Sequence, residues 1–246
     1  MAWALVLVLV AGCSFETSLD VPRDSARDTV ARDAPPDTRV APFCDPADLT
    51  LLACYEFEGT ANDASPHALH ATMTNLTFVP GKVAQALQFG VNSAADVADS
   101  SVIDVASLTL EAWVHPFQLP GTGARTGIVD MDGQWGLFLH EPTGRLQCTM
   151  AGGISMQIDA MIPVNAWTHV ACTYGAGTTT IYVNGVKRFQ QGGGGVLATG
   201  GTSGYSLGAD NPPGSGSRIN GLIDQMRIFS RVLTEAEVCQ SAACVQ

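Results

Sequence analysis

From Cys44 onward, apolar and polar residues alternate in short runs that are separated by turn residues. A period of two is typical of β-strands with one face toward a core, and clusters of Gly, Pro, Asn and Asp mark the turns between them. This pattern predicts an all-β domain. The expected strands are Leu51–Glu58, Ala71–Val79, Gln85–Phe89, Ser107–His115, Gly127–Met131, Trp135–His140, Arg145–Met150, Ser155–Ala160, Trp167–Tyr174, Thr178–Val183, Val186–Gln190, Tyr205–Gly208 and Leu222–Phe229.

Two local signals are stronger than the rest. Asn184-Gly185 stands between Ile181–Val183 and Val186–Arg188 and predicts a type I′ hairpin turn, because both central positions of that turn need positive φ. Thr234 followed by Glu237 predicts a capping box that opens a short helix through Gln240. We therefore expect one well-defined hairpin and one short C-terminal helix.

The apolar run Ala2–Ala11 is too short to span a bilayer and is typical of the core of a signal peptide. It is followed by Val10-Ala11-Gly12-Cys13, which resembles the lipobox of bacterial lipoproteins. This resemblance implies that residues 1–12 are removed, that Cys13 carries lipid, and that the protein is anchored in the bacterial cell envelope outside the cytoplasm. Ser14 after the cysteine indicates the outer membrane by analogy with enteric bacteria. The alternative is an ordinary secretory signal in which Cys13 has no special role.

Residues 13–43 are polar, contain repeated Arg-Asp pairs and are interrupted by four prolines. Such a segment cannot bury a core and should form a disordered tether with a reach of roughly 30 Å. No further linker or internal repeat follows, so residues 44–246 are expected to form one domain.

The composition supports an acidic, strand-rich protein. The chain has 14% charged residues, 26 glycines and a net charge of −11. The first 43 residues hold four of the 12 basic and six of the 23 acidic residues, so 8 basic and 17 acidic residues remain in the domain. Because nucleic acid would be repelled, we exclude it as a partner.

Six cysteines remain after Cys13, and an even number in an exported chain indicates disulfides. By strand alternation Cys148 and Cys172 both point into the core, so we expect them to pair. For Cys44, Cys54, Cys239 and Cys244 the sequence leaves two arrangements open, either Cys44–Cys54 with Cys239–Cys244 or cross-links between the two ends.

Six blocks in order carry a family resemblance. They are Leu52–Gly59 with Ala61–Ser65, Val79–Lys82 with Gln85–Phe89, Leu108–Val114, Ala166–Ala171, Ile181–Gly185 and Asn220–Ile228. Together they resemble the laminin G-like branch of the concanavalin A-like lectin/glucanase superfamily. The resemblance implies a two-sheet antiparallel jelly-roll β-sandwich over about Leu51 to Val238, and it leaves the ligand undefined.

The superfamily includes glucanases, whose retaining members need two carboxylates about 5 to 5.5 Å apart. No Glu-x-Asp-x-x-Glu-like run occurs, and there is no Gly-x-Ser-x-Gly nucleophile motif. The nearest acid is Glu111, beside Trp113 and His115. We therefore expect no catalysis and keep a weak glycosidase that uses Glu111 as a remote hypothesis.

Alternation places Asp224 on the same strand face as Leu222, Met226 and Ile228, toward the core. A buried carboxylate is costly unless it is neutralised or coordinated. The family resemblance suggests a structural Ca²⁺ held by Asp224, by Glu58 or Asp63, and by nearby carbonyl groups. The alternative is that Asp224 accepts backbone hydrogen bonds without any metal.

Aromatic residues on polar strand faces are the candidate ligand contacts. Trp113 and His115 lie on the face opposite Leu110, Ala112 and Val114, where they could stack on a sugar unless loops cover them. Trp135, between Gly133 and Gly136, is the candidate for an exposed contact. These features favour a tethered binding module for a glycan or another extracellular ligand. An adhesion protein that binds another protein through a sheet face is the second hypothesis.

Overall fold

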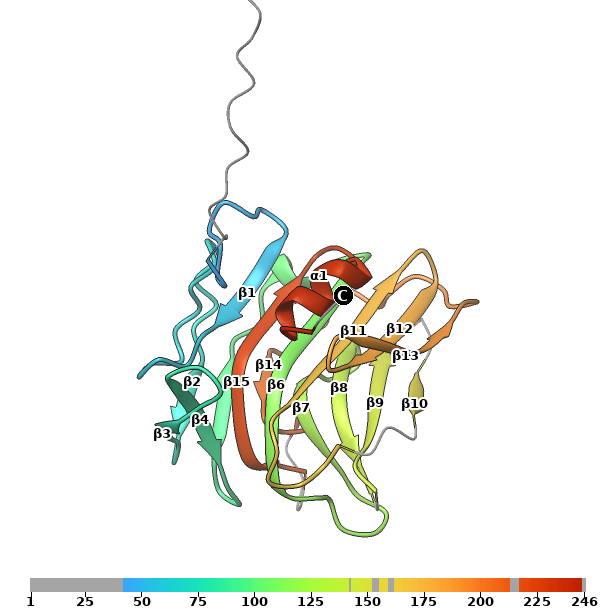
Figure 1. The fold of residues 1–246 in the computed structure, drawn as a ribbon. Coiled ribbons are helices and arrows are strands. Elements are labelled where there is room, and N and C mark those ends of the chain that lie inside the picture. Colours follow the sequence, from blue (N-terminus) through green and yellow to red (C-terminus); the bar gives the residue numbers. More distant parts are fainter. Residues whose placement is uncertain (1–41, 142, 152–154, 159–161, 213–216, 245–246) are drawn as a thin grey trace, which may run out of the picture. The chain divides into compact units, whose positions relative to one another are not determined.

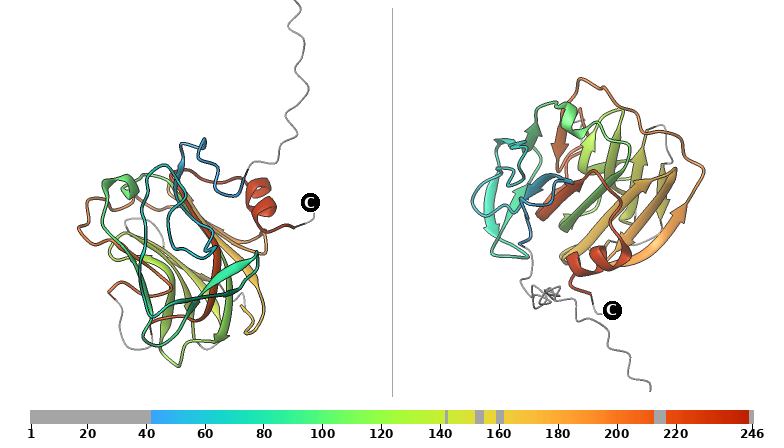
Figure 2. Two further views of the ribbon diagram at one scale, coloured as in Figure 1. Left: turned by 90° about the vertical axis from the view of Figure 1, so that its left-hand side faces the viewer. Right: turned by 90° about the horizontal axis from the view of Figure 1, so that it is seen from above.

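The computed structural model describes residues 42–141, 143–151, 155–158, 162–212 and 217–244, which belong to one compact unit. Two antiparallel sheets lie face to face, with helix α1 (Glu235–Ser241) on the outside (Figures 1 and 2). This confirms the all-β class that the strand pattern predicted and the jelly-roll sandwich that the family resemblance implied. The signal peptide, Cys13 and nearly all of the expected tether lie outside the described residues. Within the described part, no helix is both long and apolar enough to cross a membrane.

The eight-stranded sheet has the order β13-β12-β11-β6-β15-β4-β3, and β1 pairs with the second half of β15. The seven-stranded sheet has the order β10-β9-β8-β7-β14-β5-β2. The strands of the first sheet are β1 (Leu51–Tyr55), β3 (Thr77–Pro80), β4 (Gln85–Phe89), β6 (Leu108–Gln118), β11 (Thr168–Gly175), β12 (Thr178–Val183), β13 (Val186–Gln191) and β15 (Asn220–Phe229). Those of the second are β2 (Thr72–Thr74), β5 (Ala94–Val97), β7 (Arg125–Met131), β8 (Trp135–His140), β9 (Arg145–Met150), β10 (Met156–Ile158) and β14 (Tyr205–Leu207). A 3₁₀ turn, η1 (Ser101–Ile103), follows β5.

Alternation explains the core. Leu110, Ala112 and Val114 of β6 point inward and share one hydrophobic cluster with Leu137 and Leu139 of β8 in the other sheet. Their polar neighbours point away from the core, so each sheet has an inner apolar face and an outer face. The outer faces are the surfaces on which ligand contacts can be sought.

Several strand boundaries differ from the prediction. The expected strand Ala71–Val79 is two strands, β2 and β3, which belong to different sheets, because Asn75 adopts φ 51° between them. The first strand ends before Phe57, which adopts φ 60°. Strand β5 was not predicted, and β6 runs three residues beyond His115.

Both local signals are confirmed. Asn184 and Gly185 have φ of 50° and 74° in the turn between β12 and β13. The Thr234 side chain accepts a hydrogen bond from the Glu237 amide, and the Glu237 side chain accepts one from the Thr234 amide. Sequence-local chemistry therefore fixes these two features.

Three disulfides connect the six cysteines. Cys148 of β9 pairs with Cys172 of β11, which joins the two sheets through the core as expected. Of the two arrangements left open, the structure has Cys44–Cys54 and Cys239–Cys244. Disulfides persist in oxidising compartments, so this domain fits an extracytoplasmic location.

Candidate ligand-binding surface

The outer face of the eight-stranded sheet carries Glu111, Trp113 and His115 of β6, as alternation predicted. On the neighbouring strand β11, Ala171 pairs with Glu111 and His169 pairs with Trp113. Strand β15 lies on the other side of β6. The face divides into three parts along β6. Helix α1 and the first described residues cover one end, a loop covers the middle, and the other end is partly exposed among the described residues.

At the covered end, Glu111 is buried in a network of polar groups. Arg227 of β15 donates from Nε to Glu111 Oε1 at 2.7 Å, and His169 Nε2 lies 3.5 Å from Oε2. Ser241 of α1 donates to the same Oε1 at 3.3 Å. Burial alone would raise the pKa of Glu111, but the bonds to His169 and Arg227 outweigh it and hold this pKa below its usual value.

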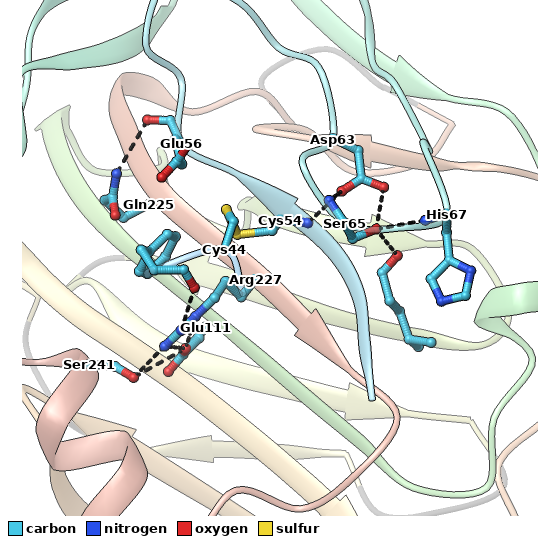
Figure 3. Close-up of a disulfide and its surroundings, with 12 residues drawn as sticks. Cys44, Cys54, Glu56, Asp63, Ser65, His67, Glu111, Gln225, Arg227 and Ser241 are labelled. Atoms are coloured by element: carbon cyan, nitrogen blue, oxygen red, sulfur yellow. Dashed lines mark hydrogen bonds and ion pairs between the residues drawn. A yellow bond between two sulfur atoms is a disulfide. The ribbon is translucent and has the colours of Figure 1, made fainter. Parts of the chain in front are cut away.

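The first described residues close this network from outside (Figure 3). Arg227 Nη1 donates to the Phe43 carbonyl at 2.9 Å, and its guanidinium lies 4.2 Å from the centroid of the Phe43 ring. Cys44 is tied to β1 by its disulfide. Glu111 is therefore only 2% exposed and is engaged as a counter-ion, out of reach of a substrate.

In the middle of the face, Trp113 is 8% exposed. Lys82, from the loop between β3 and β4, places its Nζ 4.1 Å from the centroid of the Trp113 ring, and His169 contacts that ring edge to face. A loop thus covers this indole, which was the alternative considered for it.

The open end of the face holds three aromatic side chains, His115, Phe117 and Trp167, which we call the aromatic surface. The ring centroids of His115 and Trp167 lie 5.2 Å apart, and those of His115 and Phe117 lie 5.5 Å apart. Phe117 is 38% exposed. Two exposed amide side chains stand beside it, and Asn220 Nδ2 donates to Gln118 Oε1 at 3.5 Å.

The sequence identified only part of this surface. His115 was a candidate, whereas Phe117 was missed because the predicted strand stopped two residues before it. The period of two from Trp113 through His115 would have placed Phe117 on the same face. Trp135, the other candidate, was wrong as an exposed contact, because it is 2% exposed and packs in the core against Tyr205.

The candidate metal ligand Asp224 lies at a break in the sheet. Strand β4 pairs with the first half of β15, up to Ile223, and β1 pairs with its second half, from Met226. Between these halves Gln225 adopts φ 48° and forms a bulge. The pairing advances by three residues along β15, from Asp224 to Arg227, but by only two residues along β6. The predicted common face was therefore wrong. Met226 points into the core, while Asp224 pairs with Trp113 and points outward.

Although it points outward, Asp224 is fully buried under the loop between β3 and β4. The Val83 amide donates to its Oδ2 at 2.9 Å, and Oδ1 has no hydrogen-bond partner among the described residues. Burial raises the pKa of Asp224 to about 6 against the effect of the backbone amides of Val83, Gln225 and Lys82, and the charge of Glu58 raises it further. A buried carboxylate oxygen without a partner is a position that a cation would stabilise.

Of the two acids expected beside Asp224, only Glu58 is near enough for its charge to affect that group. Asp63 is engaged elsewhere. Its carboxylate accepts from the amides of Cys54, Ser65 and Leu69, each at 2.8 Å, and from the Ser65 hydroxyl. Asp63 therefore does not fit a cation site, whereas Asp224 keeps one unpartnered oxygen and has the charge of Glu58 nearby. The described residues contain no group of three or more His, Cys, Asp or Glu side chains that could hold a metal ion.

Comparison with solved structures shows the same fold in known binding domains. Domain 4 of AbnA, a GH43 extracellular arabinanase from Geobacillus stearothermophilus solved with arabinotriose, superposes with a TM-score of 0.66 and 22% identity. The match covers 78% of this chain and 98% of that domain. The binding domain of Paraclostridial Mosquitocidal Protein 1 follows at TM-score 0.62 and 21% identity, over 78% of this chain and 52% of that one.

A third similar structure is the binding domain of botulinum neurotoxin DC in complex with rat synaptotagmin II, with TM-score 0.58 and 13% identity over 79% of this chain and 51% of that one. At these identities the likeness shows the fold alone. No curated protein matches the sequence significantly. Residues 89–239 match the family model of the concanavalin A-like lectin/glucanases superfamily. Since this match spans more than half of the chain, the protein belongs to that superfamily.

Proposed function

We propose that this protein is an extracellular binding module whose aromatic surface binds a glycan. The observation that carries the proposal is the cluster of His115, Phe117 and Trp167 at the open end of a sheet face that is otherwise covered. Aromatic rings suit the apolar CH groups of sugar rings, and a few amides nearby can bond the sugar hydroxyls. Gln118 and Asn220 supply such amides.

The structural neighbours support a binding role rather than identify a ligand. One was solved with arabinotriose and another with a protein, synaptotagmin II. The parent enzyme of the first is an arabinanase, but the domain that matches is its fourth. In this chain the acid nearest to the aromatics, Glu111, is sealed under Arg227 and Phe43. We therefore favour binding without catalysis.

The test is a glycan array probed with the chain from Ser14 onward, followed by calorimetry on the best hit. Phe117→Ala should weaken binding about tenfold, the effect of losing one partly buried ring contact. Phe189→Ala is the matched control, because Phe189 is 44% exposed on β13 of the same sheet but away from the aromatic surface.

The proposal fails if Phe117→Ala and Phe189→Ala bind the glycan equally well. If the array gives no hit but a protein ligand is found whose affinity depends on Phe117, the assignment of a glycan as the ligand is wrong. The adhesion hypothesis then replaces it. Melting curves of both variants show whether a loss of affinity comes from unfolding.

We further propose that a Ca²⁺ ion bound by Asp224 and Glu58 stabilises the junction between β1 and β4. An ion at a hundred times its dissociation constant would stabilise the fold by about 2.7 kcal/mol. Melting should therefore shift upward in Ca²⁺ relative to chelator, and Asp224→Asn should abolish the shift. Asp63→Asn is the control, since it lowers the melting temperature by removing hydrogen bonds but leaves the Ca²⁺ response intact. An equal melting temperature with and without Ca²⁺ would contradict the proposed Ca²⁺ site.

The lipobox-like sequence before Cys13 supports a further proposal, about location. We propose that Cys13 is lipidated and that residues 14–43 tether the domain to the bacterial outer membrane. Metabolic labelling with a fatty-acid analogue should mark the native chain and not the Cys13→Ser variant. Labelling that persists in the variant would contradict the lipid anchor.

A further inference from the structure

Three exposed apolar side chains lie at one end of the sandwich, the end where β1 begins and β15 ends (Figure 1). They are Leu49, which is 83% exposed, Val196, which is 79% exposed, and Val232, which is 44% exposed. Single exposed apolar residues are common on protein surfaces and need no explanation. These three differ because they come from separate loops that meet at the same end, and we call them the apolar tip.

The loops that carry Leu49 and Val232 are bonded to each other. The Ser230 amide donates to the Thr50 carbonyl at 2.8 Å, and Arg231 Nε donates to Thr50 Oγ1 at 2.9 Å. Leu49 directly precedes Thr50, and Val232 directly follows Arg231. The two apolar side chains are therefore held on neighbouring loops.

The loop that carries Val196 reaches the same end through the turn between β11 and β12. A side chain at Gly175, where β11 ends, would come within 2.4 Å of Val232 Cγ2. On the other side of the turn, the Gly194 amide donates to the Gly177 carbonyl at 2.9 Å. Since hydrogen bonds hold these loops in place, little order has to be imposed on them when the apolar tip is covered.

The described chain also begins at this end of the sandwich (Figure 1). The Phe43 carbonyl accepts a hydrogen bond from Arg227 Nη1 at 2.9 Å, and Cys44 is linked to Cys54 in β1. The N-terminal segment is therefore attached to the domain at the end that carries the apolar tip. A segment of this length and composition has a reach of roughly 30 Å.

We propose that the apolar tip inserts into the surface of a phospholipid bilayer with neutral, zwitterionic headgroups and so fixes the orientation of the domain. This rests on the lipid anchor proposed above for Cys13, which keeps the tip close to a bilayer. A short flexible tether gives an effective concentration on the order of millimolar, so a weak intrinsic affinity is enough. Apolar side chains are stabilised at the boundary of headgroups and acyl chains, at a depth of about 5 to 10 Å.

The charges of the domain favour neutral headgroups over anionic ones. Beside the tip, Arg231 Nη2 lies 3.5 Å from Asp48 Oδ2 and 2.7 Å from Glu237 Oε1, so this cation is already engaged. The domain as a whole has 17 acidic and 8 basic residues. An anionic bilayer repels such a domain at long range.

Insertion of the apolar tip directs the aromatic surface away from the bilayer. Strand β6 begins at the tip end, where Thr109 pairs with Phe229, and it runs through Phe117 at the other end. At about 3.3 Å per residue, Phe117 lies roughly 30 Å from the start of β6. The bilayer therefore leaves the aromatic surface accessible to a ligand outside the membrane.

The experiment attaches the chain from Ser14 onward, through an N-terminal hexahistidine tag, to phosphatidylcholine vesicles with brominated acyl chains and a nickel-chelating lipid. Val196→Trp places a fluorescent indole in the apolar tip, and bromine should quench at least about half of the added fluorescence, because the indole enters the outer 5 to 10 Å of the bilayer. Val91→Trp is the matched control. Val91 is 80% exposed but follows β4 at the opposite end, where Phe89 pairs with Gly221, so its indole should not be quenched.

A second substitution tests the tip itself. Leu49→Ser, added to Val196→Trp, should lower the equilibrium constant for insertion about tenfold, because one leucine side chain no longer leaves water. The melting temperature should stay unchanged, since Leu49 is exposed in the domain.

The proposal is overturned if Val196→Trp is not quenched, if Val91→Trp is quenched equally, or if Leu49→Ser leaves the quenching unchanged. Stronger quenching on phosphatidylglycerol vesicles would overturn the assignment to neutral headgroups. If the wild type forms dimers in sedimentation experiments and Leu49→Ser dissociates them, a second copy covers the tip and the bilayer is wrong. Because the tag replaces the lipid, none of these results depends on whether Cys13 is lipidated, which the labelling experiment tests separately.

Discussion

Asp130 should make the domain less stable as the pH rises. Its side chain is 5% exposed on β7, and the charges of Asp210 and Asp132 lie nearby. Burial, followed by these charges, raises its pKa to about 7 despite a hydrogen bond from the Asn211 amide, whereas the reference value for the unfolded chain is 3.8. Between these two values the folded protein binds more protons here than the unfolded chain, so the free energy of unfolding falls as the pH rises.

The size of the effect follows from the two pKa values. Their difference corresponds to a penalty of at most about 4 kcal/mol above pH 7. Between about pH 5 and pH 8 the wild type should lose about 2 to 3 kcal/mol relative to Asp130→Asn. The variant keeps an oxygen that can accept from the Asn211 amide, so it should be the more stable of the two at pH 8.

The assay is urea denaturation of both proteins, with disulfides intact, at several pH values. Other titrating groups are common to both proteins and cancel in the difference between their free energies of unfolding. Asp99→Asn serves as control, because Asp99 is exposed, its charge is not among those that shift the pKa of Asp130, and its removal should change stability by no more than about 0.5 kcal/mol. A difference between wild type and Asp130→Asn that does not vary with pH would refute the reasoning.

Three further perturbations test the packing. Arg227→Met leaves the charge of Glu111 buried without its guanidinium partner, so denaturation should show a loss of about 3 to 5 kcal/mol; adding Glu111→Leu should recover most of it, and no recovery would contradict the ion pair. Replacing Cys148 and Cys172 together by Ser should cost about 3 kcal/mol for this 24-residue separation, whereas a loss below about 1 kcal/mol would argue against the disulfide. Gly127→Ala forces the loop after β14 off β7 and should lower stability by about 1 to 3 kcal/mol in the same assay; an unchanged midpoint would show that the loop does not rest there.

Alternation was sufficient to predict an all-β domain and the faces of β6, because a residue that points the wrong way would bury a polar group or expose a large apolar one. The two-sheet sandwich came from the family resemblance. It failed at Asp224 because one residue with positive φ, Gln225, reverses the order of faces along β15. Nothing in a glutamine signals such a bulge. The cause lies in tertiary structure, since β15 changes its neighbour from β4 to β1 at this point.

Trp135 shows a different limit. Its neighbouring glycines suggested a loop, and a tryptophan in a loop is a natural ligand contact. In the structure both glycines instead allow β8 to form and to pack. Gly133 makes the turn before β8 at φ 76°, and Gly136 lets the Phe138 ring lie across it, since a side chain there would come within 2.4 Å of that ring. A glycine next to an aromatic residue is thus as consistent with close packing as with exposure.

The hydrogen bonds and ion pairs around Glu111 indicate whether this carboxylate could act in catalysis. A general acid or base must touch the substrate. Glu111 instead contacts Arg227, His169 and Ser241. Its strand face is covered by α1 and Phe43. A carboxylate held this way keeps its charge, and its lowered pKa opposes proton donation near neutral pH. The covered end of the sheet therefore holds the first described residues and α1, and it does not offer Glu111 to a ligand.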